Sequence, residues 1–182
     1  NRLDIRSGHF THYRMEDNNQ QTLPSDIVRD IIPYKDLLIV ATQNGVCLFE
    51  PDSGKCRQLF KDSKEGKSIK MVADILLDSE GTLWIAATGE GVFSYRFDTR
   101  KLTNYRHDSA NPNSLSNNNV NNIMQDSQGH LWFSTSGSGL DLYHPANNDF
   151  ENFDKEKNGL ASDCVYETQE SAASGKLLLI TN

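Results

Sequence analysis

The sequence repeats itself, and this repeat restricts the possible folds more than any other feature of the chain. The segment DSEGTLWIAATGEGV at 78–92 returns 48 residues later as DSQGHLWFSTSGSGL at 126–140. Weaker copies extend the pattern, and every copy opens on a valine. A regular interval of this kind indicates an array of similar supersecondary units. The opening valines, which are 44, 48 and 45 residues apart, are Val28, Val72, Val120 and Val165.

Each unit has the pattern of four short strands separated by turns. After the valine come an apolar segment, a polar turn, an apolar pair, a glycine before Val or Leu, an aromatic residue and a short apolar stretch. The Asp-Ser-x-Gly turn suits a hairpin, because Asp can accept hydrogen bonds from its own backbone and Gly adopts a positive φ. No segment shows sustained helical periodicity, which disfavours a helical repeat.

Four strands in every unit of 44 to 48 residues are typical of β-propeller blades. We therefore predict an all-β chain of antiparallel four-stranded blades, about four repeats long, that is a partial propeller cut from a larger ring. Two alternatives stay open: the chain closes on itself as four blades, or it pairs with a second copy so that half-blades complete each other. The expected parts are the last two strands of a blade at 1–20, complete blades at 26–62, 71–107 and 119–155, and the first two strands of a blade at 164–182.

Residues that recur at the same place in each unit are expected to build the frame. Trp84 and Trp132 occupy a position that Leu38 and Leu178 fill in other units, so this position needs bulk rather than a ligand. The aspartates lie in turns one blade apart and not in a shared acid/base pocket. A strand follows each Gly-x-Gly segment, whereas a phosphate loop needs a helix there. The repeat positions are Trp84, Trp132, Asp78, Asp126, Gly81, Gly129, Gly91 and Gly139.

Ligand contacts are expected where the copies differ, because loops carry function on a common frame. The loops between second and third strands, and those between consecutive blades, emerge on one face. Its longer connections, at 61–70, 106–119 and 154–163, are rich in Asn, Ser, Lys and Asp, which suit sugar hydroxyls. The expected ligand-contact residues are Gln43, Asn44, Glu90, Ser138, Arg106 and His107, of which Arg106 and His107 are the first to test.

The segment LSNNNVNNIMQDSQGHLWFSTSGSGL, from Leu115 to Leu140, resembles the two-component regulator propeller repeat. The resemblance extends over the whole chain and is strongest over 72–153. The second unit departs from it, because Leu38 stands in place of the tryptophan and YKD in place of the Asp-Ser-x-Gly turn.

The resemblance implies the periplasmic sensor region of a hybrid two-component histidine kinase of the Bacteroides type, an extracytoplasmic part of an inner-membrane protein. In such a protein the kinase lies outside these residues, and the implied signal is a glycan-derived oligosaccharide. We therefore expect no catalysis by this segment. Its expected partners are an oligosaccharide and either further blades of the parent chain or a second copy.

Composition and cysteine spacing argue against other classes. A net charge of −7 without a basic patch argues against a nucleic-acid surface. The longest aliphatic runs are too short to span a membrane, so we expect no membrane contact by this segment. The three cysteines lack metal-ligand spacing, so we expect no metal and no cofactor; Cys47 and Cys56 flank a turn and could face each other across a hairpin. A protein-binding scaffold, which needs an exposed apolar patch, stays open. So does a propeller glycan lyase or hydrolase, which needs acidic, Tyr or His residues converging at the channel.

Overall fold

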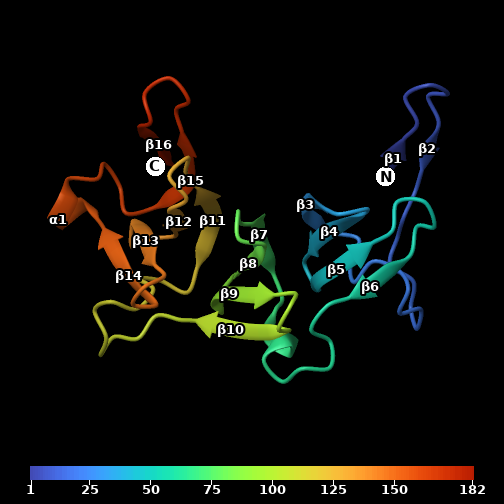
Figure 1. The fold of residues 1–182 in the computed structure, drawn as a ribbon, viewed down its shortest axis with the longest axis horizontal. Coiled ribbons are helices and arrows are strands. Elements are labelled where there is room, and N and C mark those ends of the chain that lie inside the picture. Colours follow the sequence, from blue (N-terminus) through green and yellow to red (C-terminus); the bar gives the residue numbers. More distant parts are fainter.

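The computed structural model covers residues 1–182 and shows antiparallel sheets that follow one another along an arc (Figure 1). Three sheets have four strands each, hydrogen-bonded in chain order, and we name them the first, second and third blades. A two-stranded sheet lies at each end of the arc. The prediction of an all-β chain with antiparallel four-stranded blades is confirmed.

The strand bounds follow the repeat. The first blade contains β3 (Val28–Tyr34), β4 (Leu37–Thr42), β5 (Gly45–Phe49) and β6 (Cys56–Gln58). The second contains β7 (Val72–Leu77), β8 (Thr82–Ala87), β9 (Gly91–Arg96) and β10 (Lys101–Tyr105). The third contains β11 (Val120–Gln125), β12 (Leu131–Thr135), β13 (Leu140–His144) and β14 (Asp149–Phe153). The terminal sheets are β1 (Arg2–Leu3) with β2 (Phe10–Thr11), and β15 (Val165–Glu170) with β16 (Leu177–Thr181).

Helical structure is confined to two connections between blades. These are η1 (Gly66–Ser68), which precedes the second blade, and α1 (Lys155–Asn158), which follows the third. Asp154 caps α1 by accepting a hydrogen bond from the Lys157 N–H at 2.7 Å. No helix of the chain has the length and apolar character that a membrane crossing requires.

The second strand of the second blade shows why these segments form stacked sheets. β8 has the sequence TLWIAA, and all of its residues are buried. Leu83 and Ile85 pack against the first blade, while Trp84 and Ala86 pack against the third. Alternate side chains of a strand point to opposite faces, so a strand that is apolar on both faces needs a blade on either side.

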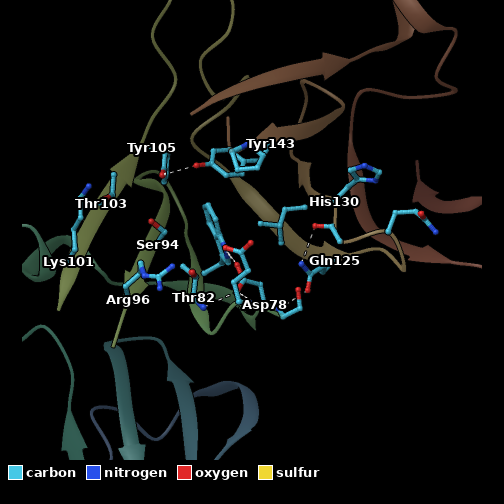
Figure 2. Close-up of a pocket in the computed structure, with 17 residues that line it drawn as sticks. Asp78, Thr82, Ser94, Arg96, Lys101, Thr103, Tyr105, Gln125, His130 and Tyr143 are labelled. Atoms are coloured by element: carbon cyan, nitrogen blue, oxygen red, sulfur yellow. Dashed lines mark hydrogen bonds between the residues drawn. The ribbon is translucent and has the colours of Figure 1, made fainter. Parts of the chain in front are cut away.

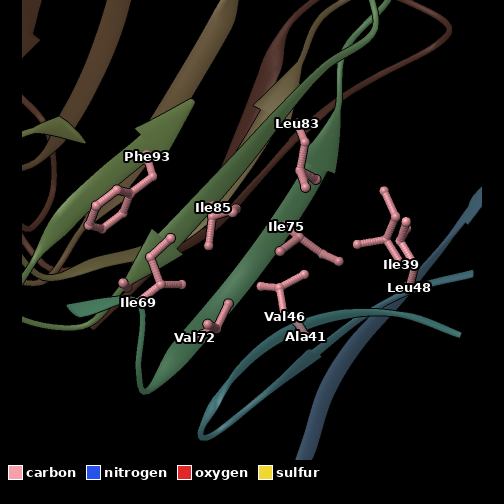
Figure 3. Packing of buried hydrophobic residues seen from close by; sticks show 11 residues of the cluster. Ile39, Ala41, Val46, Leu48, Ile69, Val72, Ile75, Leu83, Ile85 and Phe93 are labelled. Atoms are coloured by element: carbon pink, nitrogen blue, oxygen red, sulfur yellow. The ribbon is translucent and has the colours of Figure 1, made fainter. Parts of the chain in front are cut away.

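The space between the first and second blades holds 11 buried apolar residues (Figure 3). Ile39 and Val46 from the first blade meet Ile75 and Phe93 from the second. Burying one such side chain contributes about 1.5–3 kcal/mol to stability. A second cluster of 9 buried residues lies between the second and third blades, so the core is divided into layers rather than being one central mass.

The first blade corrects one expectation from the sequence. Leu38 was expected to take the place of Trp84. In the structure Ile39 takes it, because Ile39 pairs with Ile32 on β3 as Trp84 pairs with Leu76 on β7. The turn between β3 and β4 is shorter than the Asp-Ser-x-Gly turn, which shifts the equivalence by one residue. Leu38 packs against the opposite face of its blade.

Hydrogen bonds join the first strands of neighbouring blades. Strand pairing is irregular directly after each opening valine. Just beyond it, Asp74 accepts hydrogen bonds from the Ile123 N–H at 2.7 Å and the Asn122 side-chain amide at 3.0 Å. Asn122 in turn accepts one from the Thr168 N–H at 3.0 Å. Burial raises the pKa of Asp74 to about 6, although the Ile123 N–H opposes this shift.

The ends of the arc leave apolar residues uncovered. Val28 and Ile31 on β3 are 38% and 53% exposed, whereas the equivalent Val72 and Ile75 on β7 are 1% and 3% exposed. The sheet that precedes β3 has only β1 and β2, which match the outer strands of a blade. The two terminal sheets do not pair with each other, so the chain does not close into a four-bladed ring.

The cysteines are free thiols. Cys47 on β5 and Cys56 on β6 lie in one buried cluster with Phe49, close to each other as their positions around the turn suggested. A hydrogen bond with Cys56 and burial both raise the pKa of the Cys47 thiol. Cys164 is partly exposed and lies apart from this pair.

Candidate functional site

The structure brings three of the six expected ligand-contact residues together on the loop face of the second blade. Arg106 forms an ion pair with Glu90 and donates to the Gly89 carbonyl at 3.2 Å. The His107 N–H donates to the Asn118 side chain at 2.8 Å. The contacts of Arg106 attach the loop at 106–119 to the turn between β8 and β9, and the bond from His107 to Asn118 joins the two ends of that loop. The charges of Arg106 and Glu90 are therefore already paired.

The other expected residues lie over neighbouring blades. Asn44, on the first blade, donates to the Pro24 carbonyl at 3.4 Å, and the neighbouring Gln43 side chain contacts the Met71 sulfur at 3.3 Å. Ser138 lies on the third blade and accepts a hydrogen bond from Asn117 at 3.3 Å. The six residues therefore share one face but do not converge on one point.

A hollow of about 410 Å³ opens on this loop face, between the loop at 106–119 and the third blade with α1. It contains His107 and Ser138 from the expected set, and Pro112 is the one apolar residue of its lining. Beneath it, the buried Asp141 accepts bonds from the Ser116 N–H at 3.0 Å and the Asn152 amide at 3.1 Å. Burial raises the pKa of Asp141 to about 6. The hollow can offer hydrogen bonds but no apolar platform.

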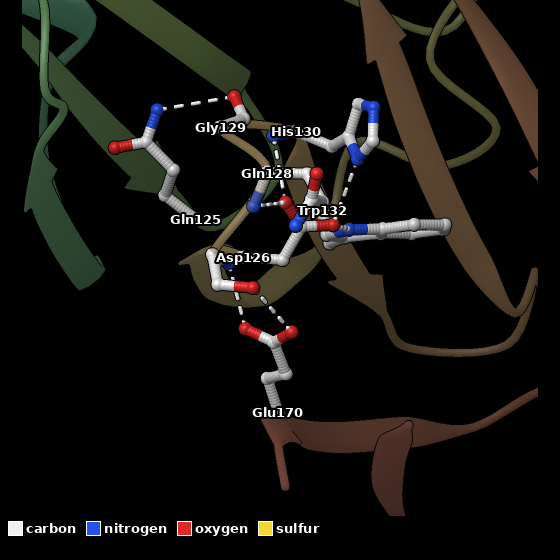
Figure 4. A network of polar contacts seen from close by, with 8 residues as sticks. Gln125, Asp126, Gln128, Gly129, His130, Trp132 and Glu170 are labelled. Atoms are coloured by element: carbon white, nitrogen blue, oxygen red, sulfur yellow. Dashed lines mark hydrogen bonds and ion pairs between the residues drawn. The ribbon is translucent and has the colours of Figure 1, made fainter. Parts of the chain in front are cut away.

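The repeated aspartate has a second role that sequence reasoning missed. Asp126 accepts hydrogen bonds from the Gln128 and His130 N–H groups at 3.0 and 2.8 Å, which closes the turn (Figure 4). Its other oxygen accepts the indole N–H of Trp132 at 2.9 Å. Burial alone would raise the pKa of Asp126, but the bonds from Trp132 and His130 outweigh it and the pKa is lowered. The carboxylate therefore joins the turn to the tryptophan six residues further on.

The second blade repeats this arrangement. Asp78 accepts bonds from the Glu80 and Thr82 N–H groups at 3.0 and 2.8 Å, and from the Trp84 indole N–H at 2.8 Å. A common Asp-to-Trp spacing is the signal that could have shown this bond in the sequence. Because every oxygen of these carboxylates is engaged by the frame, they are poorly placed for general acid/base chemistry.

The second glycine of each Gly-x-Gly segment is required by a close backbone approach. A Cβ at Gly91 would lie 2.2 Å from the Tyr105 carbonyl oxygen, and one at Gly139 would lie 2.1 Å from that of Phe153. Both glycines have φ near +80°, at 80° and 79°. Gly81 and Gly129 also have positive φ, at 79° and 88°, in the Asp-Ser-x-Gly turns.

A larger cleft of about 570 Å³ lies between the second and third blades (Figure 2). It is at the strand ends that carry the Asp-Ser-x-Gly turns, opposite the loop face, because consecutive antiparallel strands turn at alternate ends. Ser94 and Arg96 of β9, with Lys101 and Thr103 of β10, form one wall. His130 and Gln125 face them from the third blade, a side of the molecule where the sequence predicted no ligand contacts.

Aromatic rings line part of this cleft. Trp84 stacks on Tyr105 with ring centroids 5.7 Å apart and meets Tyr143 edge-on at 5.1 Å. Both tyrosine hydroxyls donate to the Asn148 side chain at 2.8 Å, which fixes the rings. Burial raises the pKa of Tyr143, so its hydroxyl stays protonated. We find no group of three or more His, Cys, Asp or Glu side chains placed to hold a metal ion.

Comparison with known proteins connects this fold to a repeat family. Residues 114–137 match the family described as Two component regulator propeller, which confirms the resemblance seen in the sequence. No curated protein sequence matches the chain significantly.

Solved structures share the fold over nearly the whole chain. The extracellular domain of BT3049 from B. thetaiotaomicron, described as a hybrid two-component system, is 22% identical with a TM-score of 0.76 over 92% of this chain and 24% of that one. The extracellular domain of BT4673 from the same organism is 21% identical with a TM-score of 0.72 over 97% of this chain and 23% of that one. PorZ, a surface component of the type-IX secretion system of Porphyromonas gingivalis, is 17% identical with a TM-score of 0.69 over 97% and 27%. The chain thus spans about a quarter of the length of these structures.

Proposed function

We propose that this chain, which combines a two-component regulator propeller repeat with a blade fold, is an extracytoplasmic sensor segment of a hybrid two-component histidine kinase. In this proposal it lies in the periplasm and responds to glycan-derived oligosaccharides, and the kinase lies outside these residues. The observation that carries the proposal is the repeat at 114–137 within a chain whose fold resembles two extracellular domains over 92% and 97% of its length.

The chemistry of the surface supports binding rather than turnover. The carboxylates of Asp78 and Asp126 are held by turn N–H groups and an indole N–H. Asp141 is buried beneath the loop-face hollow and bound to Ser116 and Asn152. Glycoside hydrolysis needs two free carboxyl groups about 5–10 Å apart on either side of a bound sugar. We therefore propose a segment without catalytic activity.

The packing between blades limits how a signal can pass through the segment. Each blade buries apolar residues against the next, and Asp74 bonds to Ile123 and Asn122 across the inner strands. Packed interfaces of this kind resist continuous deformation. A ligand shifts a receptor only by binding one arrangement better than another. We propose that the blades move as a body relative to other parts of the receptor.

In this proposal the loop-face residues contribute to ligand contact. His107 and Ser138 line the same hollow, and Arg106 with Glu90 braces its neighbouring loop. Solvated side chains here offer both donors and acceptors to sugar hydroxyls. His107 is exposed and belongs to none of the buried apolar clusters, so His107→Ala removes a side chain from the rim of the hollow and leaves the core intact. It is the first variant to test.

The test is titration of the chain with a panel of plant, host and microbial oligosaccharides, followed by calorimetry and by product analysis of the same samples. We expect heat of binding with at least one oligosaccharide and no change in its chain length. Cleavage of any oligosaccharide would contradict the proposal in favour of an enzyme. Absence of binding heat across the panel would contradict the assignment of oligosaccharides as the signal.

A further inference from the structure

We infer that the cleft between the second and third blades is a binding site for one unit of a neutral saccharide. The inference rests on the proposed function for the class of ligand and on the geometry of the cleft for the position. This site lies at the opposite strand ends from the loop-face residues.

The corresponding place between the first and second blades is filled by apolar side chains. Leu37 and Leu48 of the first blade face the second blade within the apolar cluster there. Phe97 of the second blade stacks on Tyr34 with ring centroids 4.3 Å apart. The hollow of about 440 Å³ that Leu37 and Leu48 border is lined only by the first blade and its connections, so no cleft with walls from both blades forms here.

One blade further on, the positions of Leu37, Leu48 and Phe97 each carry a smaller or more polar residue. Strand pairing identifies them, because Ser94 pairs with Trp84 as Leu48 pairs with Ile39. By the same registers, Thr82 stands where Leu37 does. Pro145 occupies the position of Phe97. Ser94, Thr82 and Pro145 all line the cleft. The opening is therefore a departure of one interface from the repeat, and departures from a common frame are where function is expected.

The residues that open the cleft also equip it with hydroxyl groups. Ser94 and Thr103 are directly opposite each other on β9 and β10, and Thr82 lies one strand further in. Their hydroxyls form no hydrogen bond within the protein. No buried polar side-chain atom of the chain lacks a partner, so these three hydroxyls are open to the cleft. Each can both donate and accept, as sugar hydroxyls require.

The charges of the lining favour a neutral ligand. Arg96 and Lys101 carry positive charges, and Asp78 and Glu80 carry negative ones, so the lining has no excess of either sign. Arg96 is moreover held by Asp98 at 3.0 Å. An anionic ligand would need an excess of cations, which this lining lacks.

The volume of the cleft and the aromatic rings in its lining also suit a sugar unit. A volume of about 570 Å³ is within the usual range of small-molecule sites, about 300–1,000 Å³. Tyr105 and Tyr143 line the cleft, are half-buried and are held through Asn148, so they provide apolar contact at fixed positions. Rigid aromatic faces beside polar groups provide both contact area and orientation for a pyranose ring.

The experiment titrates the full 182-residue chain with neutral gluco-, xylo- and manno-oligosaccharides and, as acidic counterparts, with oligogalacturonate. Calorimetry measures binding, and the indole N–H resonances of Trp84 and Trp132 report its position, assigned with Trp132→Phe. Trp84 lines the cleft, whereas Trp132 does not and is connected to it only through Asp126 and His130. We expect a neutral oligosaccharide to bind and to shift the Trp84 resonance more than that of Trp132.

Filling the cleft provides the decisive variant. Ser94→Leu installs the residue that the preceding interface carries, and we expect binding at least tenfold weaker with an unchanged melting temperature. Asn104→Leu, an exposed position between Thr103 and Tyr105 on the other side of β10, is the matched control and should bind normally. Should Ser94→Leu fail to fold, Thr103→Val removes one lining hydroxyl at constant shape and should weaken binding.

Each other outcome overturns a defined part of the inference. Binding heat without a Trp84 shift, unaffected by Ser94→Leu, would place the ligand elsewhere and leave the proposed function intact. Binding of oligogalacturonate in preference to every neutral oligosaccharide would refute the neutral class. No heat with any saccharide would overturn the proposed function, and this inference with it.

Discussion

The hydrogen bond between Asp78 and the indole of Trp84 provides the sharpest test of the structure. We predict that Asp78→Asn destabilises the chain mainly through this one bond. Asn keeps the size of Asp and retains one oxygen for the Glu80 and Thr82 N–H groups. Its amide nitrogen must then face the indole N–H, where the carboxylate oxygen now accepts at 2.8 Å. Two donors would face each other in a buried site.

The magnitude follows from the burial of the donor. Trp84 is 3% exposed, so water cannot replace the lost acceptor. Leaving a buried N–H without a partner costs about 1–3 kcal/mol. Trp84→Phe removes the N–H, so Asp78→Asn should cost less in that background. We therefore expect a coupling free energy between the two substitutions of about 1–3 kcal/mol.

The assay is urea unfolding of the wild type, both single variants and the double variant, followed by circular dichroism. The matched cycle is Asp126→Asn with Trp132→Phe, which removes the same bond at 2.9 Å in a partly buried setting. Water reaches this second indole more easily, so its coupling should be smaller than that of the buried pair. Additive effects at the buried pair, within about 0.5 kcal/mol, would refute the reasoning.

Three further predictions concern other parts of the frame. Burial holds the pKa of Asp74 at about 6 against an ordinary 3.8, so folding favours its protonated form and the free energy of unfolding should fall as the pH rises through this interval. Asp74→Asn should remove that part of the fall. Equal pH slopes of the free energy of unfolding in urea titrations of variant and wild type would contradict the prediction. Gly139→Ala should destabilise the chain by clearly more than Gly137→Ala, because a Cβ meets a carbonyl oxygen at 2.1 Å in the first case and open space in the second; both also incur a left-handed backbone cost of about 1–2 kcal/mol, and equal melting temperatures would argue against the close approach. Iodoacetamide should label Cys164 alone in the folded chain, since the other two thiols are buried; mass spectrometry that finds all three labelled at the same rate would show that the first blade opens.

The sequence predicted most of the frame because the relevant interactions are local or repeated. Asp-Ser-x-Gly turns, alternating apolar residues and Gly-x-Gly segments recur within units of 44 to 48 residues, and each constrains the backbone over a few residues. Where the interval changed, the prediction failed. A shorter turn moved Ile39 into the position that sequence comparison had assigned to Leu38. Strand register depends on turn length, which a comparison of apolar residues alone does not fix.

The candidate sites depended on tertiary structure to a greater degree. Six residues were expected on one face because loops of that face vary, but which of them meet was not predictable. Glu90 and Arg106 proved to be partners of each other, which leaves less of their charge for a ligand. The bond from Asp78 to Trp84 was also missed, although its spacing repeats, because an indole N–H can bond in many directions until packing orients it.

What the sequence by itself determined was the repeat and hence the blade: the order of strands, their turns, and the need to bury both faces of the inner strands. Only the tertiary structure decided which side chains of neighbouring blades meet, and therefore which interface is filled and which one is open. The cleft arises because Ser94 and Pro145, about fifty residues apart, replace two large apolar side chains at one meeting point. Such a void is a difference in volume between two packed surfaces, and it appears only when both surfaces are in place.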